Sequence, residues 1–322
     1  MIFLGVDTGG TFTDFVVLEH GQMRVHKVLS TPSAPEQAIF QGITELGLQQ
    51  KPLTVIHGST VATNAALEGK GVKTAYVTNK GLKDVLTIGR QARPQLYNLQ
   101  PQMITPPVDA ALCLEVDCRL SADGNWLTEL SSNELDNLGR KIRSLDVEAV
   151  AVNLLFSYLD DAAELAIKKH LPDGLFVSLS SQVLSEIGEY ERGIATWLNA
   201  WVGPLIQGYI NRLQQGLHSS HLSVMQSSGE TMDAGQAASQ AVRMLLSGPA
   251  GGLVGARFVA AKSALNRLMT FDMGGTSTDV ALIDNRLQLT NRGRIGNYPV
   301  AVPMVDMHTI GAGGGSIARL DS

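Results

Sequence analysis

Short apolar runs separated by turns dominate the first third of the chain. Two stretches between these runs, 34–48 and 60–71, instead carry apolar residues at helical spacing. Alternating strands and helices of this kind predict an α/β fold with layered helices. The runs typical of strands are IFLGV (2–6), FVVL (15–18), LTVIHGS (53–59) and KTAYVTN (73–79).

The rhythm changes over residues 90–130, where prolines and the polar turn S-A-D-G-N predict loops, short edge strands and an insertion. It returns at VEAVAVNLLF (147–156), which is apolar almost throughout. A strand of this composition is typical of a parallel sheet that is buried on both faces. The longest helical stretch, 189–217, is predicted to bridge two halves of the molecule.

The most specific pattern is a repeat of eight residues that lies between apolar runs in both places. Residues 7–14 read D-T-G-G-T-F-T-D and residues 272–279 read D-M-G-G-T-S-T-D, so six of eight positions agree. Apolar runs around a Gly-Gly pair predict two β-hairpins, and glycines expose the backbone N–H groups that bind anions. We therefore expect two lobes, 1–187 and 188–322, each carrying one phosphate-binding hairpin. The chain contains no Walker A motif.

Two such hairpins on opposite sides of a cleft would bind a polyphosphate between them. Asp7 and Asp272 end the entering strands, where a carboxylate can hold Mg²⁺, usually through water. We expect these two residues to be the catalytic and metal-binding carboxylates. The predicted phosphate contacts are Gly9, Gly10, Thr11 and Thr13 in the first hairpin, and Gly274, Gly275, Thr276 and Ser277 in the second.

Composition restricts the class of protein. The 322 residues are 44% hydrophobic, which is enough for a folded core, and the formal net charge of −5 argues against nucleic acid or an anionic membrane as a partner. No stretch approaches the roughly 18 apolar residues of a membrane span, and the N-terminus leads directly into a strand without a signal sequence. The two cysteines, Cys113 and Cys118, favour free thiols in a reducing compartment. We expect a cytoplasmic protein.

The paired hairpins resemble those of the actin, sugar-kinase and Hsp70 superfamily, whose bilobal fold is ribonuclease H-like. The flanking motifs are more specific and, in order along almost the whole chain, resemble the hydantoinase A / 5-oxoprolinase family. They are H-G-S-T-V-A-T-N-A (57–65), D-V-L-T-I-G-R-Q-A-R-P-Q-L-Y (84–97), A-V-N-L-L-F-S-Y (151–158), Y-E-R (190–192), V-M-Q-S-S-G (224–229), L-S-G-P-A-G-G (246–252), F-D-M-G-G-T-S-T-D-V (271–280) and I-G-A-G-G-G-S-I-A (310–318).

The resemblance implies an enzyme that uses ATP and a divalent cation to open a cyclic amide, or a relative of the ATP-dependent ketone carboxylases. It implies an A-type subunit with a B-type partner, or a homo-oligomer. Family members extend several hundred residues beyond the position of Ser322, so we expect the second lobe to be incomplete. Glu230 also departs from the glycine that is more common there.

The remaining candidate residues have weaker signals. Gly313 and Gly314 lie in a glycine run that we assign to nucleotide binding; a dinucleotide loop is the alternative, although the pattern falls short of G-x-G-x-x-G. His57 follows a predicted strand and is expected to point into the cleft, Arg90 could hold a substrate carboxylate, and His308 precedes the glycine run. A structural role is the alternative for each of these three residues.

Three functions are therefore open. The first is an ATP-dependent cyclic amide hydrolase that activates the carbonyl by phosphoryl transfer. The second is a shortened, non-catalytic protein that binds nucleotide or a partner, and the third is a small-molecule kinase of the same superfamily.

Overall fold

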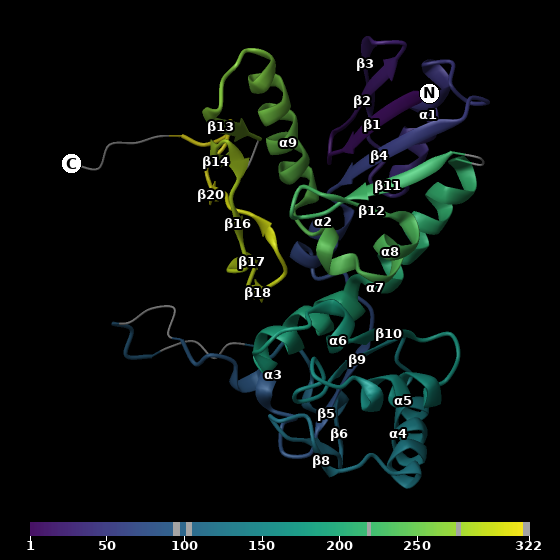
Figure 1. Cartoon of the computed structure of the whole chain (residues 1–322), viewed down its shortest axis with the longest axis vertical. Coiled ribbons are helices and arrows are strands. Elements are labelled where there is room, and N and C mark those ends of the chain that lie inside the picture. The colour runs from purple at the N-terminus through teal and green to yellow at the C-terminus, as the bar shows by residue number, and fades with distance from the viewer. Residues whose placement is uncertain (93–96, 101–104, 218–219, 275–277, 318–322) are drawn as a thin grey trace.

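The computed structural model describes residues 1–92, 97–100, 105–217, 220–274 and 278–317 (Figure 1). Three β-sheets organise these residues, and two helices, α7 and α9, lie between them. Strands β1 and β13 both lie in the upper half of Figure 1, on different sheets.

A six-stranded mixed sheet carries the first hairpin. Strands β1 and β2 are antiparallel, with Asp7 opposite Asp14, whereas β1, β4 and β11 run parallel to one another. Apolar side chains alternate along β1 and β2, so one face of the sheet is buried and the other is open. In spatial order the strands are β12 (Thr231–Asp233), β11 (His221–Met225), β4 (Leu53–Ser59), β1 (Ile2–Thr8), β2 (Phe12–Glu19) and β3 (Gln22–Leu29).

A second, four-stranded parallel sheet lies at the bottom of Figure 1. All residues of β9 are buried, as the apolar run 147–156 predicts for a strand covered on both faces. Helices α4 (Ser132–Leu145) and α5 (Ala162–His170) cover one face, and α7 covers the other. The strands are β10 (Phe176–Leu179), β9 (Ala149–Asn153), β5 (Thr74–Asn79) and β6 (Cys113–Val116).

Helix α7 (Glu189–Leu217) joins the first two sheets into one core. It runs continuously through Pro204 and contacts β9 and β10 on one side and α1 and α8 on the other. Its glycines admit aromatic rings: a Cβ on Gly203 would lie 2.4 Å from the Phe176 ring, and one on Gly216 would lie 2.0 Å from the Phe40 ring.

The third sheet carries the second hairpin and packs on α9 (Ser247–Lys262). Its core is small among the described residues, with five buried members: Ala250, Leu253, Ala281, Ile283 and Val305. The strands are β13 (Arg267–Met273), β14 (Thr278–Asp284), β15 (Arg286–Leu287) and β20 (His308–Ile310).

Shorter elements complete the described chain. The helices are α1 (Pro35–Glu45), α2 (Val61–Leu67), α3 (Val85–Ile88), α6 (Ser180–Val183) and α8 (Ala234–Ser239), with 3₁₀ turns at Ala110–Leu112 and Ala241–Met244. The strand pairs are β7 (Arg119–Leu120) with β8 (Trp126–Thr128), β16 (Leu289–Thr290) with β19 (Met304–Val305), and β17 (Gly293–Ile295) with β18 (Tyr298–Val300).

The predicted α/β class and both predicted hairpins are therefore confirmed. The sheets do not divide at the boundary expected after residue 187, because α7, β11 and β12 follow it in sequence yet complete the first two sheets. Among the described helices, none has the length and apolar character needed to cross a bilayer.

Candidate functional site

The first hairpin ends in a turn that is open to solvent. Gly9 closes it by donating its N–H to the Phe12 carbonyl at 3.0 Å. Gly10 and Thr11 are exposed, and neither amide has an acceptor within the described part of the chain. Two free N–H groups at a glycine turn can donate hydrogen bonds to an anion.

Ser30, which follows β3, stabilises this turn through hydrogen bonds. Its hydroxyl donates to the Gly9 carbonyl at 2.7 Å and lies 3.0 Å from the Thr13 hydroxyl, while its N–H donates to the Thr11 carbonyl. Thr13 is fully buried in this arrangement. Its expected phosphate contact is therefore corrected to a structural role, because its hydroxyl points into the protein toward Ser30. The sequence offered no signal for the part played by Ser30.

Asp7 lies where three elements meet. In register it faces Gly58 on β4, and its Oδ1 atom would lie 3.2 Å from a Cβ on Gly58 and 3.7 Å from a Cβ on Gly248, in the first turn of α9. These two glycines let β4 and α9 approach the carboxylate closely. The start of α9 falls in the L-S-G-P-A-G-G motif, and its positive dipole end is directed toward this region.

The surroundings of Asp7 raise its pKa. Partial desolvation is the largest cause, although the side chain keeps an exposed surface, and the nearby carboxylates of Asp14 and Asp272 raise it further. The effect of Asp272 is informative because that residue is 265 positions away in sequence. The geometry agrees with this, because Gly248 in the first turn of α9 lies next to Asp7 and Pro249 in the same turn lines a cavity with Asp272.

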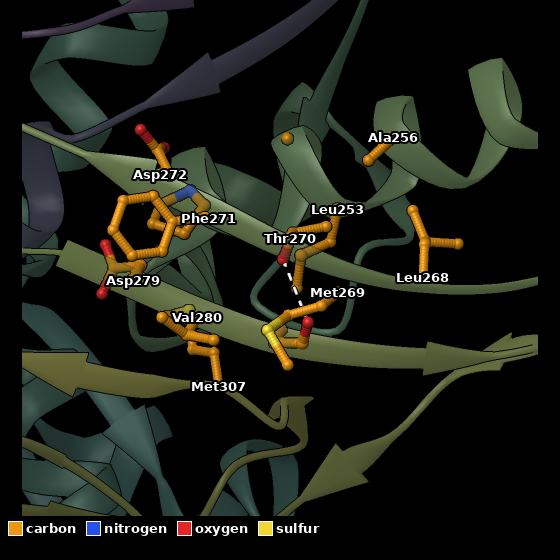
Figure 2. A pocket seen from close by; sticks show the side chains of 13 residues that line it. Leu253, Ala256, Leu268, Met269, Thr270, Phe271, Asp272, Asp279, Val280 and Met307 are labelled. Atoms are coloured by element: carbon orange, nitrogen blue, oxygen red, sulfur yellow. Dashed lines mark hydrogen bonds between the residues drawn. The ribbon is translucent and has the colours of Figure 1, made fainter.

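The second hairpin repeats the geometry of the first, with Asp272 opposite Asp279. A cavity of about 420 Å³ lies between this hairpin and α9. Figure 2 shows Asp272 and Asp279 at one end of the hairpin, on either side of the Phe271 ring, whereas apolar side chains such as Leu253 and Leu268 line the rest. Gly275, Thr276 and Ser277, the other expected phosphate contacts, lie outside the described residues.

The glycine run near the C-terminal end packs beside this hairpin. The Gly314 amide donates to the Gly274 carbonyl at 2.9 Å, and the Thr278 hydroxyl donates to the Ala312 carbonyl at 2.6 Å. Gly313 donates to the Ser316 hydroxyl. The structure thus brings Gly313 and Gly314 to the second hairpin, although their amides are engaged within the protein.

The three expected substrate residues lie in different places. His57 is fully buried: its Nε2 is 2.7 Å from the Tyr209 hydroxyl on α7, and burial lowers its pKa to about 4. The expectation that His57 points into the cleft is corrected, because its neutral ring belongs to the core between β4 and α7. His308 is exposed on β20, opposite Val280.

Arg90 lies away from both hairpins, beside the start of α7. It makes two hydrogen bonds to Glu191, Nε to Oε1 at 2.7 Å and Nη2 to Oε2 at 2.6 Å. Its guanidinium is thus already paired with a carboxylate of this chain. Among the described residues, no cluster of three or more His, Cys, Asp or Glu side chains forms a protein-only metal site. A cation between Asp7 and Asp272 would therefore need further oxygen ligands from water or phosphate.

Comparisons with known proteins agree with this geometry. Residues 3–173 match the model of the hydantoinase/oxoprolinase N-terminal region, and residues 192–322 match the hydantoinase/oxoprolinase model. The alpha subunit of caprolactamase from Pseudomonas jessenii is 31% identical over 99% of this chain and 49% of that protein. The 5-oxoprolinase of Saccharomyces cerevisiae is 32% identical over 98% of this chain and 28% of that protein.

Solved structures show the same architecture. Nucleotide-free acetone carboxylase, described as carrying out ATP-dependent carboxylation, superimposes with a TM-score of 0.84 at 25% identity. The match covers 99% of this chain and 49% of that one. The chain thus spans about half the length, or less, of the relatives that it matches.

Proposed function

Because the chain belongs to the hydantoinase/oxoprolinase family, we propose that it binds Mg-ATP between its two hairpins and uses it to activate a cyclic amide for hydrolysis. The observation that carries this proposal is the placement of the start of α9 against both hairpins: Gly248 lies close to Asp7, and Pro249 lines a cavity together with Asp272. The match to an ATP-dependent acetone carboxylase and to caprolactamase supports ATP as the nucleotide.

The chemistry explains why an amide hydrolase would need ATP. Amide resonance makes the carbonyl carbon a poor electrophile and the nitrogen a poor leaving group. Attack of the amide oxygen on the γ-phosphorus, with ADP leaving, gives an imidate phosphate whose carbon accepts water. The ring C–N bond then breaks with protonation of the nitrogen, and a second water releases phosphate from the acyl phosphate.

The residues of this chain would position the phosphate groups and neutralise their charge, and would not themselves form bonds to the substrate. The free amides of Gly10 and Thr11 suit a phosphate oxygen, and the dipole of α9 adds positive potential near Asp7. Asp7 and Asp272 offer the hard oxygen ligands that Mg²⁺ prefers. Bound there, Mg²⁺ would neutralise phosphate charge during transfer.

We infer further that the chain acts as the A-type part of a larger assembly. Its relative in caprolactamase is named a subunit, and the chain matches only about half of that subunit. A B-type partner would complete such an assembly. A homo-oligomer is the alternative assembly.

Binding of Mg-ATP by isothermal titration calorimetry tests the site directly. We expect Asp7→Asn and Asp272→Asn each to weaken binding about tenfold or more, because each removes a carboxylate from the proposed cation position. Asp284→Asn is the matched control: it lies on the same second hairpin but at the far end, paired with Arg267. Unchanged affinity in both Asp7→Asn and Asp272→Asn would contradict the proposal.

A second assay separates the candidate reactions. ADP release is measured with the chain and a B-type partner in the presence of 5-oxoproline, caprolactam or acetone with bicarbonate. Release stimulated by a cyclic amide supports the amidase, stimulation only by the ketone assigns the chain to carboxylation, and ATP binding without any turnover assigns it a binding role.

A further inference from the structure

A second cavity, of about 400 Å³, lies away from the two hairpins and shares no lining residue with the Asp7 region. Four segments that are separate in sequence form it: α3 with the turn after it, residues 105–107, the start of α7, and the β17–β18 hairpin. In Figure 1, β17 and β18 lie above α3. Leu86, Ile194 and Pro299 supply apolar walls.

One wall of this cavity contains an ion pair with no net charge. Arg90 and Glu191 form the two-bond pair described above, and the Arg90 guanidinium lies 5.7 Å from the centre of the Tyr190 ring. Gly89, with φ of +54°, brings the chain close to the Tyr190 hydroxyl, to which an added Cβ would lie at 3.4 Å. The pair therefore holds Tyr190 in place without contributing net charge.

The β17–β18 hairpin contributes an exposed cation, Arg294, to the lining of this cavity. Arg294 of β17 donates one hydrogen bond, from Nη2 to the Asn297 carbonyl at 3.1 Å, and has no carboxylate partner in the described part of the chain. Arg294 and Tyr190 line the same cavity, and desolvation followed by the charge of Glu191 raises the pKa of the Tyr190 phenol. Tyr190 thus keeps its proton, and its hydroxyl has no acceptor among the described residues.

We propose that this cavity binds a small organic carboxylate, with its anionic group between Arg294 and the Tyr190 hydroxyl and its apolar body against Leu86, Ile194 and Pro299. One unpaired positive charge and one neutral donor match a monoanion. Pockets of this size bind small molecules, and apolar walls with a few convergent polar groups are typical of them. This site is independent of the proposed nucleotide site.

Binding of benzoate in the absence of nucleotide tests the proposal by calorimetry, with benzamide as the uncharged analogue of the same shape. We expect benzoate to bind at least tenfold more tightly than benzamide. Arg294→Gln should weaken benzoate binding about tenfold, and Tyr190→Phe should weaken it severalfold. The matched control is Arg292→Gln, an exposed arginine two positions away that does not line the cavity.

A spectroscopic readout keeps the test independent of variant stability. In protein labelled at tyrosine, benzoate should shift the Tyr190 ring resonances at concentrations that leave Tyr97, an exposed tyrosine outside the cavity, unaffected. Equal binding of benzoate and benzamide, unchanged affinity in Arg294→Gln, or displacement of benzoate by equimolar inorganic phosphate would each overturn the assignment to an organic carboxylate.

Discussion

At the scale of single residues, buried polar groups decide where chemistry can occur. The sequence context of His57, H-G-S-T after a strand, predicts that it points into the cleft, yet Tyr209 lies against it from α7. Its Nδ1 is 3.4 Å from the Val6 carbonyl, so a proton on Nδ1 leaves Nε2 to accept from the tyrosine hydroxyl. The imidazole is therefore held neutral, because neither contact stabilises a charged ring enough to offset its burial.

This burial predicts a loss of stability in mild acid. The folded-state pKa of His57 is about 4, below the value near 6.5 of an unfolded histidine, so the unfolded state binds a proton first as pH falls. Between pH 7 and pH 5 we expect this residue alone to lower the free energy of unfolding by about 2 kcal/mol. Urea denaturation of the wild type and of His57→Gln should show a shallower pH dependence for the variant. An identical pH dependence in the wild type and His57→Gln would contradict the assignment of His57 as a buried neutral residue.

At the scale of secondary-structure elements, the effect of a helical glycine on stability depends on what packs against it. Gly203 in α7 admits the Phe176 ring, which allows the helix to lie directly on β10. Gly255 in α9 is exposed, and a Cβ there would meet nothing within 4 Å. The sequence predicts that both glycines lie in the middle of a helix. Only the tertiary packing shows that Gly203 is buried and Gly255 is exposed.

The same substitution should therefore change stability in opposite directions. Gly203→Ala forces a methyl group into the Phe176 ring and is expected to destabilise the protein by about 1–3 kcal/mol. Gly255→Ala is expected to stabilise it by about 0.5–1 kcal/mol, because alanine loses less backbone entropy in a helix. Thermal or urea unfolding followed by circular dichroism measures both. A stabilising Gly203→Ala would show that the close packing is not as described.

At the scale of the whole molecule, the two hairpins rest on cores of different size. The first belongs to the large core that joins two sheets through α7, and the second belongs to the small cluster under α9. Strand β13 is mostly exposed, with Met269 and Phe271 more than 60% accessible. Few buried contacts mean a low free energy of local opening.

We therefore expect hydrogen exchange to differ between the two hairpins. Backbone amides of β13 and β14 should exchange faster than those of β1 and β4 in the free protein, as peptide-resolved mass spectrometry can measure. Mg-ATP should slow exchange at both hairpins together if it binds across them. Equal protection of β13 and β4 in the free protein would contradict this expectation.

Local pattern alone determined much of this protein. The apolar runs and Gly-Gly turns specify both hairpins and the buried strand β9, because strand periodicity and turn chemistry act over a few residues. The family motifs, read in order, also predicted the family to which the chain belongs. The repeat also predicted that Asp7 and Asp272 lie on facing hairpins, and in the structure the start of α9 lies next to both of them.

Only the tertiary structure decided which candidate side chains remain available. His57 is buried by a tyrosine 152 positions later, Arg90 is paired with a glutamate 101 positions later, and Thr13 is turned inward to Ser30. Hydrogen bonds and burial depend on which atoms lie within a few ångströms in space, and for these residues the partners come from elements that no local pattern links to them. Packing in space likewise brought Arg294 and Tyr190, which are 104 positions apart in sequence, to the lining of one cavity.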